Sequence, residues 1–533
     1  MAIIRDMKGF IFSLILIVLA TSCKQDQAKQ IEVNQGIIIN NIMVISANSE
    51  EVFSFEGYVV IEGDRIAYSG RERPLVKGNF RELDGEGKYI ISGLMDSHVH
   101  LANTAGFNGP LKNKYPELLD AYFEQLPRSY LYHGFTCLID VNNYAPEVIN
   151  EIKRSPVHPQ IFTCGKQVQV MNDFEMEMEG TPMAKRYESN FLHDPYNKEV
   201  TIPDSIDLYE HTPEKIIDHI KNEEGIAVKV IYEDEASGLI VTWAKPSLGI
   251  ITDLVKEAKK ENLPVLIHGP SLEGHHIGLH SGVEILAHGL WNWTTDFEGE
   301  FENLRLTTAH KEVLLGIAQK QLGYQLTART ILGEEDLILD VFLDDNNLEH
   351  VYPKEYLDVL KSKEGDWGRN KILGRGSFLK RTNPSFYNAM RANHQEDVEM
   401  WESVFKLYRS RLDSVALFLS RHKANFIFGS DTPAMNMATN PPGYNGFLEM
   451  KQMHATGISL EQILRAATYN NAKAFHLESL YGGVERDKMA NLLILKSNPL
   501  RDIDAYNDIE TVIIAGEPVL REDLSATNYV DKR

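Results

Sequence analysis

The sequence predicts an α/β protein, namely a TIM-like (β/α)8 barrel with a small β-sandwich formed by the N- and C-terminal segments. Two observations lead to this prediction. Apolar strand-like runs alternate with amphipathic helical stretches through the middle of the chain, and short strands separated by turn residues occur at both ends. The length of 533 residues allows one large domain and one smaller domain.

The N-terminus carries a bacterial export pattern. Basic residues precede the apolar run GFIFSLILIVLA, which is too short to span a bilayer, and small residues then precede Cys23. Residues 1–22 resemble a lipoprotein signal peptide; an ordinary cleaved signal or a short anchor is the alternative. Residues 23–35 begin with polar text, KQDQAKQ after the cysteine, and are predicted to be a tether. Lipid on Cys23 would anchor the protein to the outer membrane of the cell envelope, facing the periplasm or exposed at the surface.

Residues 36–91 and 478–525 are predicted to form the β-sandwich together. The first range contains GIIINNIMVIS and GYVVIEGDRIAYSG, and the second contains MANLLILKSNPL and DIETVIIAGEPVL. An isolated hairpin is only marginally stable in water, so we expect the two groups of strands to pair in one unit.

Residues 92–477 are predicted to form the barrel. Its candidate strands include IAVKVIY, PVLIHG, EILAHG and NFIFGSD, and their continuous apolar character suits strands that are buried on both faces. The sequence contains no glycine-rich dinucleotide motif after the first strand and no P-loop lysine motif, which argues against a nucleotide-binding fold. Residues 331–410 interrupt the alternation with charged and aromatic text. They are predicted to be a helical insertion, which is either a lid or an addition with a structural role only.

The composition narrows the range of partners. There are 54 basic and 76 acidic residues, with a formal charge of -22, so nucleic acid is not an expected partner. Of the three cysteines, Cys137 and Cys164 lie in apolar strand-like text, where buried thiols are expected and no disulfide framework is indicated. We expect a small-molecule substrate, and a homo-oligomer is compatible with the sequence.

Polar side chains that could bind a metal ion stand at or near the ends of candidate strands, which meet on one face of a βα barrel. His98 and His100 are two residues apart on an extended segment, so both imidazoles point to the same side. Lys229 lies inside an apolar strand, where burial would lower its pKa and leave an amine able to form a carbamate with carbon dioxide. A lysine that reaches the strand end or pairs with Glu233 or Glu235 is the alternative.

Three further side chains extend this group. His268 and His288 each end an apolar strand and precede a glycine, which permits a turn. Asp431 follows the last apolar strand, where it could act as an oxygen ligand or a general base. Other residues after the strands are candidates either for lining a pocket or for packing, namely Tyr232, Trp291, Trp293, Tyr324 and Arg329.

This order of residues resembles the amidohydrolase superfamily over nearly the whole mature chain. The superfamily signature has H-x-H after the first barrel strand, a lysine on the fourth, histidines on the fifth and sixth, and an aspartate on the eighth. The closing text LRAATYNNAKAFHLESLYGGVERDKMANLLIL is similar to the imidazolonepropionase-like and zinc-prolidase-like branch. Ser92 and Asn491 replace the usual proline and aspartate, outside the signature. The matching positions here are His98, His100, Lys229, His268, His288 and Asp431.

The resemblance implies a metal-dependent hydrolase that cleaves an amide-type bond in a dipeptide, an N-acyl amino acid or a cyclic amide. It implies two Zn²⁺ ions bridged by carboxylated Lys229, with manganese, iron or cobalt as alternatives. His98, His100 and Asp431 would hold one ion, and His268 and His288 the other. Metal-activated water would attack the carbonyl while Asp431 acts as general acid and base.

Two other functions stay open. Deaminases of the same superfamily use one metal ion and a glutamate three residues after the fifth-strand histidine, a position that Ser271 occupies here. A lipoprotein without catalytic activity that binds metal or ligand at the cell surface would hold metal and show no turnover.

Overall fold

The computed structural model describes residues 30–178, 180–188, 191–198, 200–236, 239–240, 243–293, 305–382 and 384–528. The predicted signal peptide, Cys23 and the first part of the predicted tether lie outside these ranges. Among the described residues, no helix combines the length and the apolar character needed to cross a membrane.

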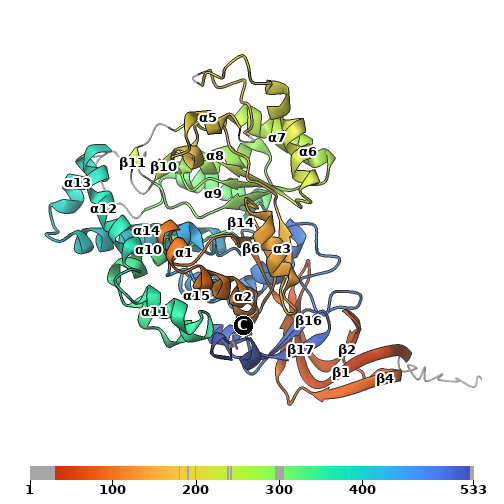
Figure 1. The fold of residues 1–533 in the computed structure, drawn as a ribbon. Coiled ribbons are helices and arrows are strands. Elements are labelled where there is room, and N and C mark those ends of the chain that lie inside the picture. Colours follow the sequence, from red (N-terminus) through yellow and green to blue (C-terminus); the bar gives the residue numbers. More distant parts are fainter. Residues whose placement is uncertain are drawn as a thin grey trace, which may run out of the picture.

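Strands from both ends of the chain form one mixed sheet of eight strands (Figure 1). Its order is β17-β16-β15-β5-β1-β2-β3, and β4 pairs with β1. The strands β15 and β5 pair in the antiparallel sense, so the end of the chain completes a sheet that its beginning started. The strands are β1 (Gln30–Ala47), β2 (Val52–Glu62), β3 (Arg65–Gly70), β4 (Leu75–Asp84), β5 (Tyr89–Ser92), β15 (Leu492–Leu495), β16 (Ile509–Ile514) and β17 (Glu517–Leu520).

This mixed sheet curls until its two sides meet. An antiparallel bridge joins Arg65 of β3 to Met489, which lies just before β15. Apolar side chains inside the curl form a core of their own, with Ile39, Val59 and Leu492 among its buried members. The unit that the sequence predicts as a β-sandwich is therefore one sheet wrapped around its own core.

The strand β1 begins earlier than predicted, because residues 30–35 of the predicted tether already belong to it. Ile31 pairs with Val76 of β4, and Val33 is buried in a small cluster with Ile38 and Val60. Apolar and polar residues alternate here, so one face of the segment can be buried. Residues 30–35 are thus strand and not linker.

Leu492 tests the junction between the two ends of the chain. Its side chain is fully buried in the core of the curled sheet, and the residue pairs with Ser92 of β5. We expect Leu492→Ala to lower the free energy of unfolding by about 2–5 kcal/mol, because the truncation leaves a cavity. Denaturant unfolding measures this loss. The matched control Leu520→Ala, at an exposed position of β17, should change stability by less than about 0.5 kcal/mol. Equal losses in the two variants would contradict the role of Leu492 in the core of the curled sheet.

The middle of the chain contains two parallel sheets, with the orders β6-β7-β8 and β14-β13-β12-β9. Helices alternate with these strands, which confirms the predicted α/β class. A short antiparallel pair, β10 (Glu235–Ala236) and β11 (Leu239–Ile240), follows β9. The parallel strands are β6 (Leu94–Val99), β7 (Phe135–Asp140), β8 (Gln160–Thr163), β9 (Val228–Ile231), β12 (Val265–His268), β13 (Ile285–Ala287) and β14 (Gly323–Tyr324).

Isolated parallel bridges connect the two parallel sheets. Val168, which follows β8, pairs with Val230 of β9. On the other side, residues 425–432 lie between β14 and β6 and bridge to both strands. These bridges support a ring of parallel strands, and closure into a regular eight-stranded barrel stays a prediction.

Residues 425–431, predicted as the last barrel strand, depart from a regular strand. The backbone N–H of Phe428 donates to the side chain of Asn471. Asp431 has a left-handed φ of 56°, and its N–H donates to the His98 carbonyl at 2.8 Å. The segment therefore ends in a turn that places Asp431 against β6.

Helices cover the parallel sheets and alternate with their strands along the chain (Figure 1). Ser459 caps α16 through a capping box with Gln462, and a π-helical turn at Ala466–Asn470 separates α16 from α17. The helices outside the predicted insertion are α1 (Gly109–Lys114), α2 (Pro116–Tyr132), α3 (Pro146–Arg154), α4 (Phe174–Met178), α5 (Met183–Arg186), α6 (Pro213–Asn222), α7 (Leu248–Lys260), α8 (Leu272–Ser281), α9 (Thr308–Lys320), α15 (Tyr444–Ala455), α16 (Leu460–Arg465) and α17 (Asn471–Ala474).

The predicted insertion at residues 331–410 is helical, and its helices run from residue 329 to residue 421. Its longest helix, α14, packs against α10 and α12, and Arg409 of α14 pairs with the buried Glu335 of α10. Glu334 of α10 is almost fully buried and pairs with Arg375 of α12 at 2.8 Å. The helices are α10 (Arg329–Leu339), α11 (Lys354–Leu360), α12 (Trp367–Thr382), α13 (Pro384–Arg391) and α14 (Asp397–Arg421).

Candidate metal centre

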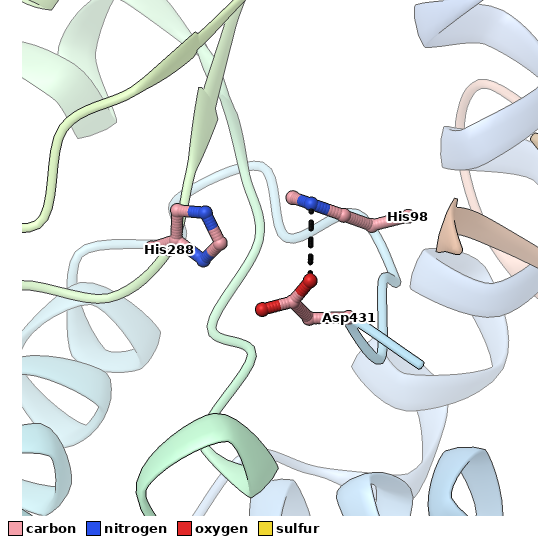
Figure 2. A group of neighbouring side chains, drawn as sticks. All are labelled: His98, His288 and Asp431. Carbon is pink, nitrogen blue, oxygen red and sulfur yellow. Dashed lines mark ion pairs between the residues drawn. The ribbon is translucent and has the colours of Figure 1, made fainter. Parts of the chain in front are cut away.

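Within the described part of the chain, His98, His288 and Asp431 form a group of potential metal ligands. Each offers one ligand atom, these atoms lie within 4.8 Å of one another, and all three residues are buried. His98 Nε2 is 3.5 Å from Asp431 Oδ1, and the two imidazole centroids are 4.9 Å apart. Figure 2 shows the carboxylate beside His98, with His288 across the space between them. Imidazole nitrogen and carboxylate oxygen are ligands that zinc takes, so this group could hold a divalent cation.

His100 and Lys229 lie against this group. His100 follows β6, and its Nε2 donates to Asp431 Oδ1 at 3.0 Å. Lys229 is the second residue of β9, and its Nζ is 3.4 Å from His98 Nε2. The structure therefore brings the predicted H-x-H pair and the predicted lysine to the same point.

His268, the last of the six predicted residues, also lies beside this group. It is the last residue of β12, and its ring centroid is 4.4 Å from that of His288, which directly follows β13. Its Nε2 donates to Glu233 Oε2 at 2.9 Å, which leaves Nδ1 for another partner. Glu233, a possible partner of Lys229 in the sequence, contacts His268 instead.

The sequence did not indicate the hydrogen-bond partners of His98 and His288. His98 Nδ1 donates to Gln325 Oε1 at 2.9 Å, and His288 Nδ1 is 2.9 Å from Thr327 Oγ1. Both partners lie in the segment that follows β14, two residues apart. A partner on one ring nitrogen fixes the orientation of a histidine and directs the other nitrogen toward a cation. Nε2 of His98 and of His288 are thus the nitrogens left for a metal.

Burial dominates the protonation of the lysine and the histidines. It lowers the pKa of Lys229 to about 8 and, together with the Lys229 charge, lowers the pKa of His268 to about 3. In the described part of the chain, the structure gives Lys229 no carboxylate within ion-pair distance. A buried ammonium without such a partner is costly. This environment fits a lysine that is neutral or carboxylated beside a cation.

Asp431 remains a carboxylate in these surroundings. Burial alone would raise its pKa, but the charge of His98 and the hydrogen bond from His100 lower the pKa well below its usual value. Its second oxygen, Oδ2, accepts the Thr330 hydroxyl at 3.0 Å. Asp431 is therefore held as a carboxylate, with a donor on each oxygen.

Asp96 is a further buried acid that the sequence reasoning did not identify. Its carboxylate accepts the backbone N–H groups of His98 at 3.2 Å and Ser430 at 3.0 Å, and also the Ser430 hydroxyl. Burial raises the pKa of Asp96 to about 7. Because it holds the residue before Asp431 and the backbone of His98 together, Asp96 positions both ligand candidates.

The predicted pocket-lining residues have different surroundings. Trp291 stands beside His288, with ring centroids 5.3 Å apart. Tyr324 is fully buried, and its hydroxyl is hydrogen-bonded to His275 and to the Leu290 N–H. The remaining three residues are Tyr232, Trp293 and Arg329. Lys245 Nζ lies over the ring of Tyr232, and the ring of Trp293 is tilted against that of His310. Arg329 is hydrogen-bonded to Asn445 of α15 and to Asp336 of α10.

Thr327 tests the contribution of a hydrogen-bond partner to the proposed centre. Thr327→Val keeps the shape of the side chain and removes the hydroxyl bonded to His288 Nδ1. We expect zinc affinity to fall roughly 10–100-fold, because the imidazole loses its orienting partner. Competition with a chromogenic chelator measures the change. Thr439→Val removes another buried hydroxyl, which donates to the Gly333 carbonyl, and should leave zinc affinity unchanged; equal affinities for both variants and wild type would exclude the role of Thr327.

Comparisons with known proteins connect the chain to hydrolytic enzymes. The sequence profile of the amidohydrolase family matches residues 402–519. Over 141 residues the chain is 28% identical to the 5-methylthioadenosine/S-adenosylhomocysteine deaminase of Clostridium tetani (strain Massachusetts / E88). The aligned region covers 22% of this chain and 32% of the deaminase. The chain thus spans about a third of the length of this curated relative.

Solved structures share the fold over more than nine-tenths of the chain. A Xaa-Pro dipeptidase with bound methionine superposes with a TM-score of 0.58 and 16% identity, covering 91% of this chain and 100% of that one. Phenylurea hydrolase B superposes with a TM-score of 0.58 and 16% identity, covering 93% of this chain and 99% of that one. A. niger ochratoxinase superposes with a TM-score of 0.56 and 16% identity, covering 92% of this chain and 96% of that one. At such identities the likeness concerns the fold alone. The family match is confined to residues 402–519, and the solved structures add agreement in fold.

Proposed function

We propose that the protein is a metal-dependent hydrolase of the amidohydrolase superfamily that cleaves an amide-type carbon–nitrogen bond. One observation supports this most directly, the gathering of His98, His288 and Asp431 within 4.8 Å at the ends of parallel strands. His100, Lys229 and His268 would complete the ligand set, with Lys229 carboxylated and two zinc ions bound. Substrates would be dipeptides, N-acyl amino acids or cyclic amides.

In this proposal Asp431 carries the proton. A divalent cation in the centre would polarise the scissile carbonyl and lower the pKa of water. The Asp431 carboxylate accepts a proton from the attacking water as the new C–O bond forms. It then delivers that proton to the leaving nitrogen as the C–N bond breaks. The hydroxyl of Thr330 and Nε2 of His100 hold the two carboxylate oxygens in position.

Deamination is the second candidate, because the curated relative is named as a deaminase. Ser271 stands where superfamily deaminases carry a glutamate. It is fully buried, and its hydroxyl accepts the Gly274 N–H at 3.0 Å as the N-cap of α8. A serine in this structural role supplies no carboxylic acid, which favours amide hydrolysis.

A substrate panel distinguishes these candidates. Protein loaded with zinc and protein stripped by chelator are compared on dipeptides, N-acyl amino acids, lactams and lactones, with ammonia release from aminopurine nucleosides measured in parallel. We expect hydrolysis of at least one amide that is lost on stripping and restored by zinc. Ammonia release without amide hydrolysis would favour a deaminase. Bound metal with turnover of nothing in the panel would favour a binding protein.

We also propose that the mature protein is anchored in the cell envelope through lipid on Cys23. The export pattern of the first residues supports this proposal. Mass spectrometry of the N-terminal peptide should find a diacylglyceryl cysteine. A mature N-terminus at another residue would contradict it.

A further inference from the structure

A row of rings runs past the candidate metal centre. The centroids of Trp243 and Phe174 are 4.9 Å apart in an edge-on arrangement, and Phe174 lies 6.2 Å from His268 with an interplanar angle of 14°. His268 is followed by His288 at 4.4 Å and by Trp291 at 5.3 Å. Two proposed metal ligands thus stand between aromatic side chains.

Phe174 and Trp243 differ from Trp291 in their packing. Trp291 is buried and belongs to the main hydrophobic core. Phe174 and Trp243 are only partly buried, and neither belongs to any hydrophobic cluster that the described residues form. A large ring gains most when it buries its faces. Two rings in edge-on contact that lie outside the hydrophobic clusters of the described residues, beside the proposed metal centre, are suited to bury a ligand.

Local hydrogen bonds hold these two rings together. The Ala244 N–H donates to the Asn172 carbonyl at 3.0 Å, which ties the segment of Trp243 to the start of α4. Asp173 accepts the Met176 N–H and the Val170 N–H, which fixes the turn that carries Phe174. The ring pair is therefore held in place by two segments that are distant in the sequence.

We propose that Phe174 and Trp243 form a subsite for an aromatic or bulky apolar group directly beside the scissile carbonyl. The inference rests on the proposed function, because the subsite lies next to His268 of the proposed metal centre. The substrate class is narrowed to amides whose acyl or amine part carries an aryl or large aliphatic group. Stacking and burial against the two rings would favour such a group by about tenfold or more over a methyl group.

Two hydroxamates provide the test, since they share a metal-chelating group and differ in one aryl group. Binding of acetohydroxamate and phenylacetohydroxamate to the zinc-loaded full chain is measured by calorimetry. We expect wild type to bind the phenyl compound about tenfold to a hundredfold more tightly. Trp243→Ala and Phe174→Ala should remove most of this preference and leave the Kd of acetohydroxamate unchanged, whereas Trp243→Phe should retain part of it.

A remote aromatic residue supplies the matched control. Tyr209 is 57% exposed, and Tyr209→Ala should leave both dissociation constants unchanged. Wild type with equal affinity for the two compounds, or variants with an undiminished preference, would overturn the subsite while the metal centre stands. Binding of neither compound to a chain that also retains no zinc would overturn the proposed function itself, and the subsite with it.

Discussion

Asp431→Asn should retain zinc and lose turnover by roughly 10²–10⁴-fold, the usual contribution of a positioned general acid–base group. The substitution keeps the size of the side chain and an oxygen that can accept the Thr330 hydroxyl or the His100 N–H. It removes the ability to take a proton from water. The expected result is therefore a fall in kcat with a metal content close to that of wild type, measured by steady-state kinetics and by elemental analysis of the same samples.

Asp194→Asn is the matched control for this prediction. Asp194 is also a buried carboxylate, which accepts the Ser247 N–H and hydroxyl, and it is not part of the proposed machinery. Its variant should keep near-wild-type turnover. Near-wild-type kcat for Asp431→Asn would remove Asp431 from the proton-transfer role, whereas loss of zinc in that variant would show that Asp431 acts chiefly as a ligand.

Lys229→Met should lower the zinc content from two ions per chain toward one or none, with loss of turnover. Methionine fills a similar volume and cannot form a carbamate, so no anionic bridge can hold two cations. We expect the loss of affinity to exceed the roughly 10–100-fold effect of removing an outer hydrogen-bond partner. Elemental analysis measures the stoichiometry, and ¹³C NMR of protein loaded in labelled bicarbonate should show a carbamate signal in wild type alone.

Lys488→Met is the matched control, because it replaces a buried lysine that lies far from the proposed centre. Lys488 is 7% exposed, and its Nζ donates to the carbonyls of Glu478 and Tyr481 beside the curled sheet. This variant should lose stability and keep its zinc stoichiometry. If wild type binds a single ion and shows no carbamate signal, the two-metal mechanism is wrong and a mononuclear centre replaces it.

The sequence predicted the proposed site better than its surroundings. His98 and His100 could be found because a spacing of two on an extended segment has a direct geometric meaning. Lys229 could be found because a charged residue inside an apolar run requires an explanation. Their roles as ligands stay predictions, although the structure places them together.

The hydrogen-bond partners were missed for a physical reason. Gln325, Thr327 and Glu233 are ordinary polar residues in the sequence, and only the tertiary arrangement shows which histidine each one meets. Residues 425–431 were predicted as a strand from their apolar text. The backbone of residues 425–432 bridges to β14 and β6 at the place expected of that strand, but it is irregular because it also bonds to Asn471 and ends in the left-handed turn at Asp431.

The pairing of β5 with β15 also sets the order in which the molecule can fold. One edge of β5 pairs with β1, but its other edge pairs with residues 492–495, so that edge stays unpaired until nearly all of the chain is available. Contacts between such distant segments form slowly. The curled sheet is therefore expected to be the last unit to fold, and a chain shortened before residue 492 would expose the apolar faces of Ile90 and Ile91 to aggregation or proteolysis.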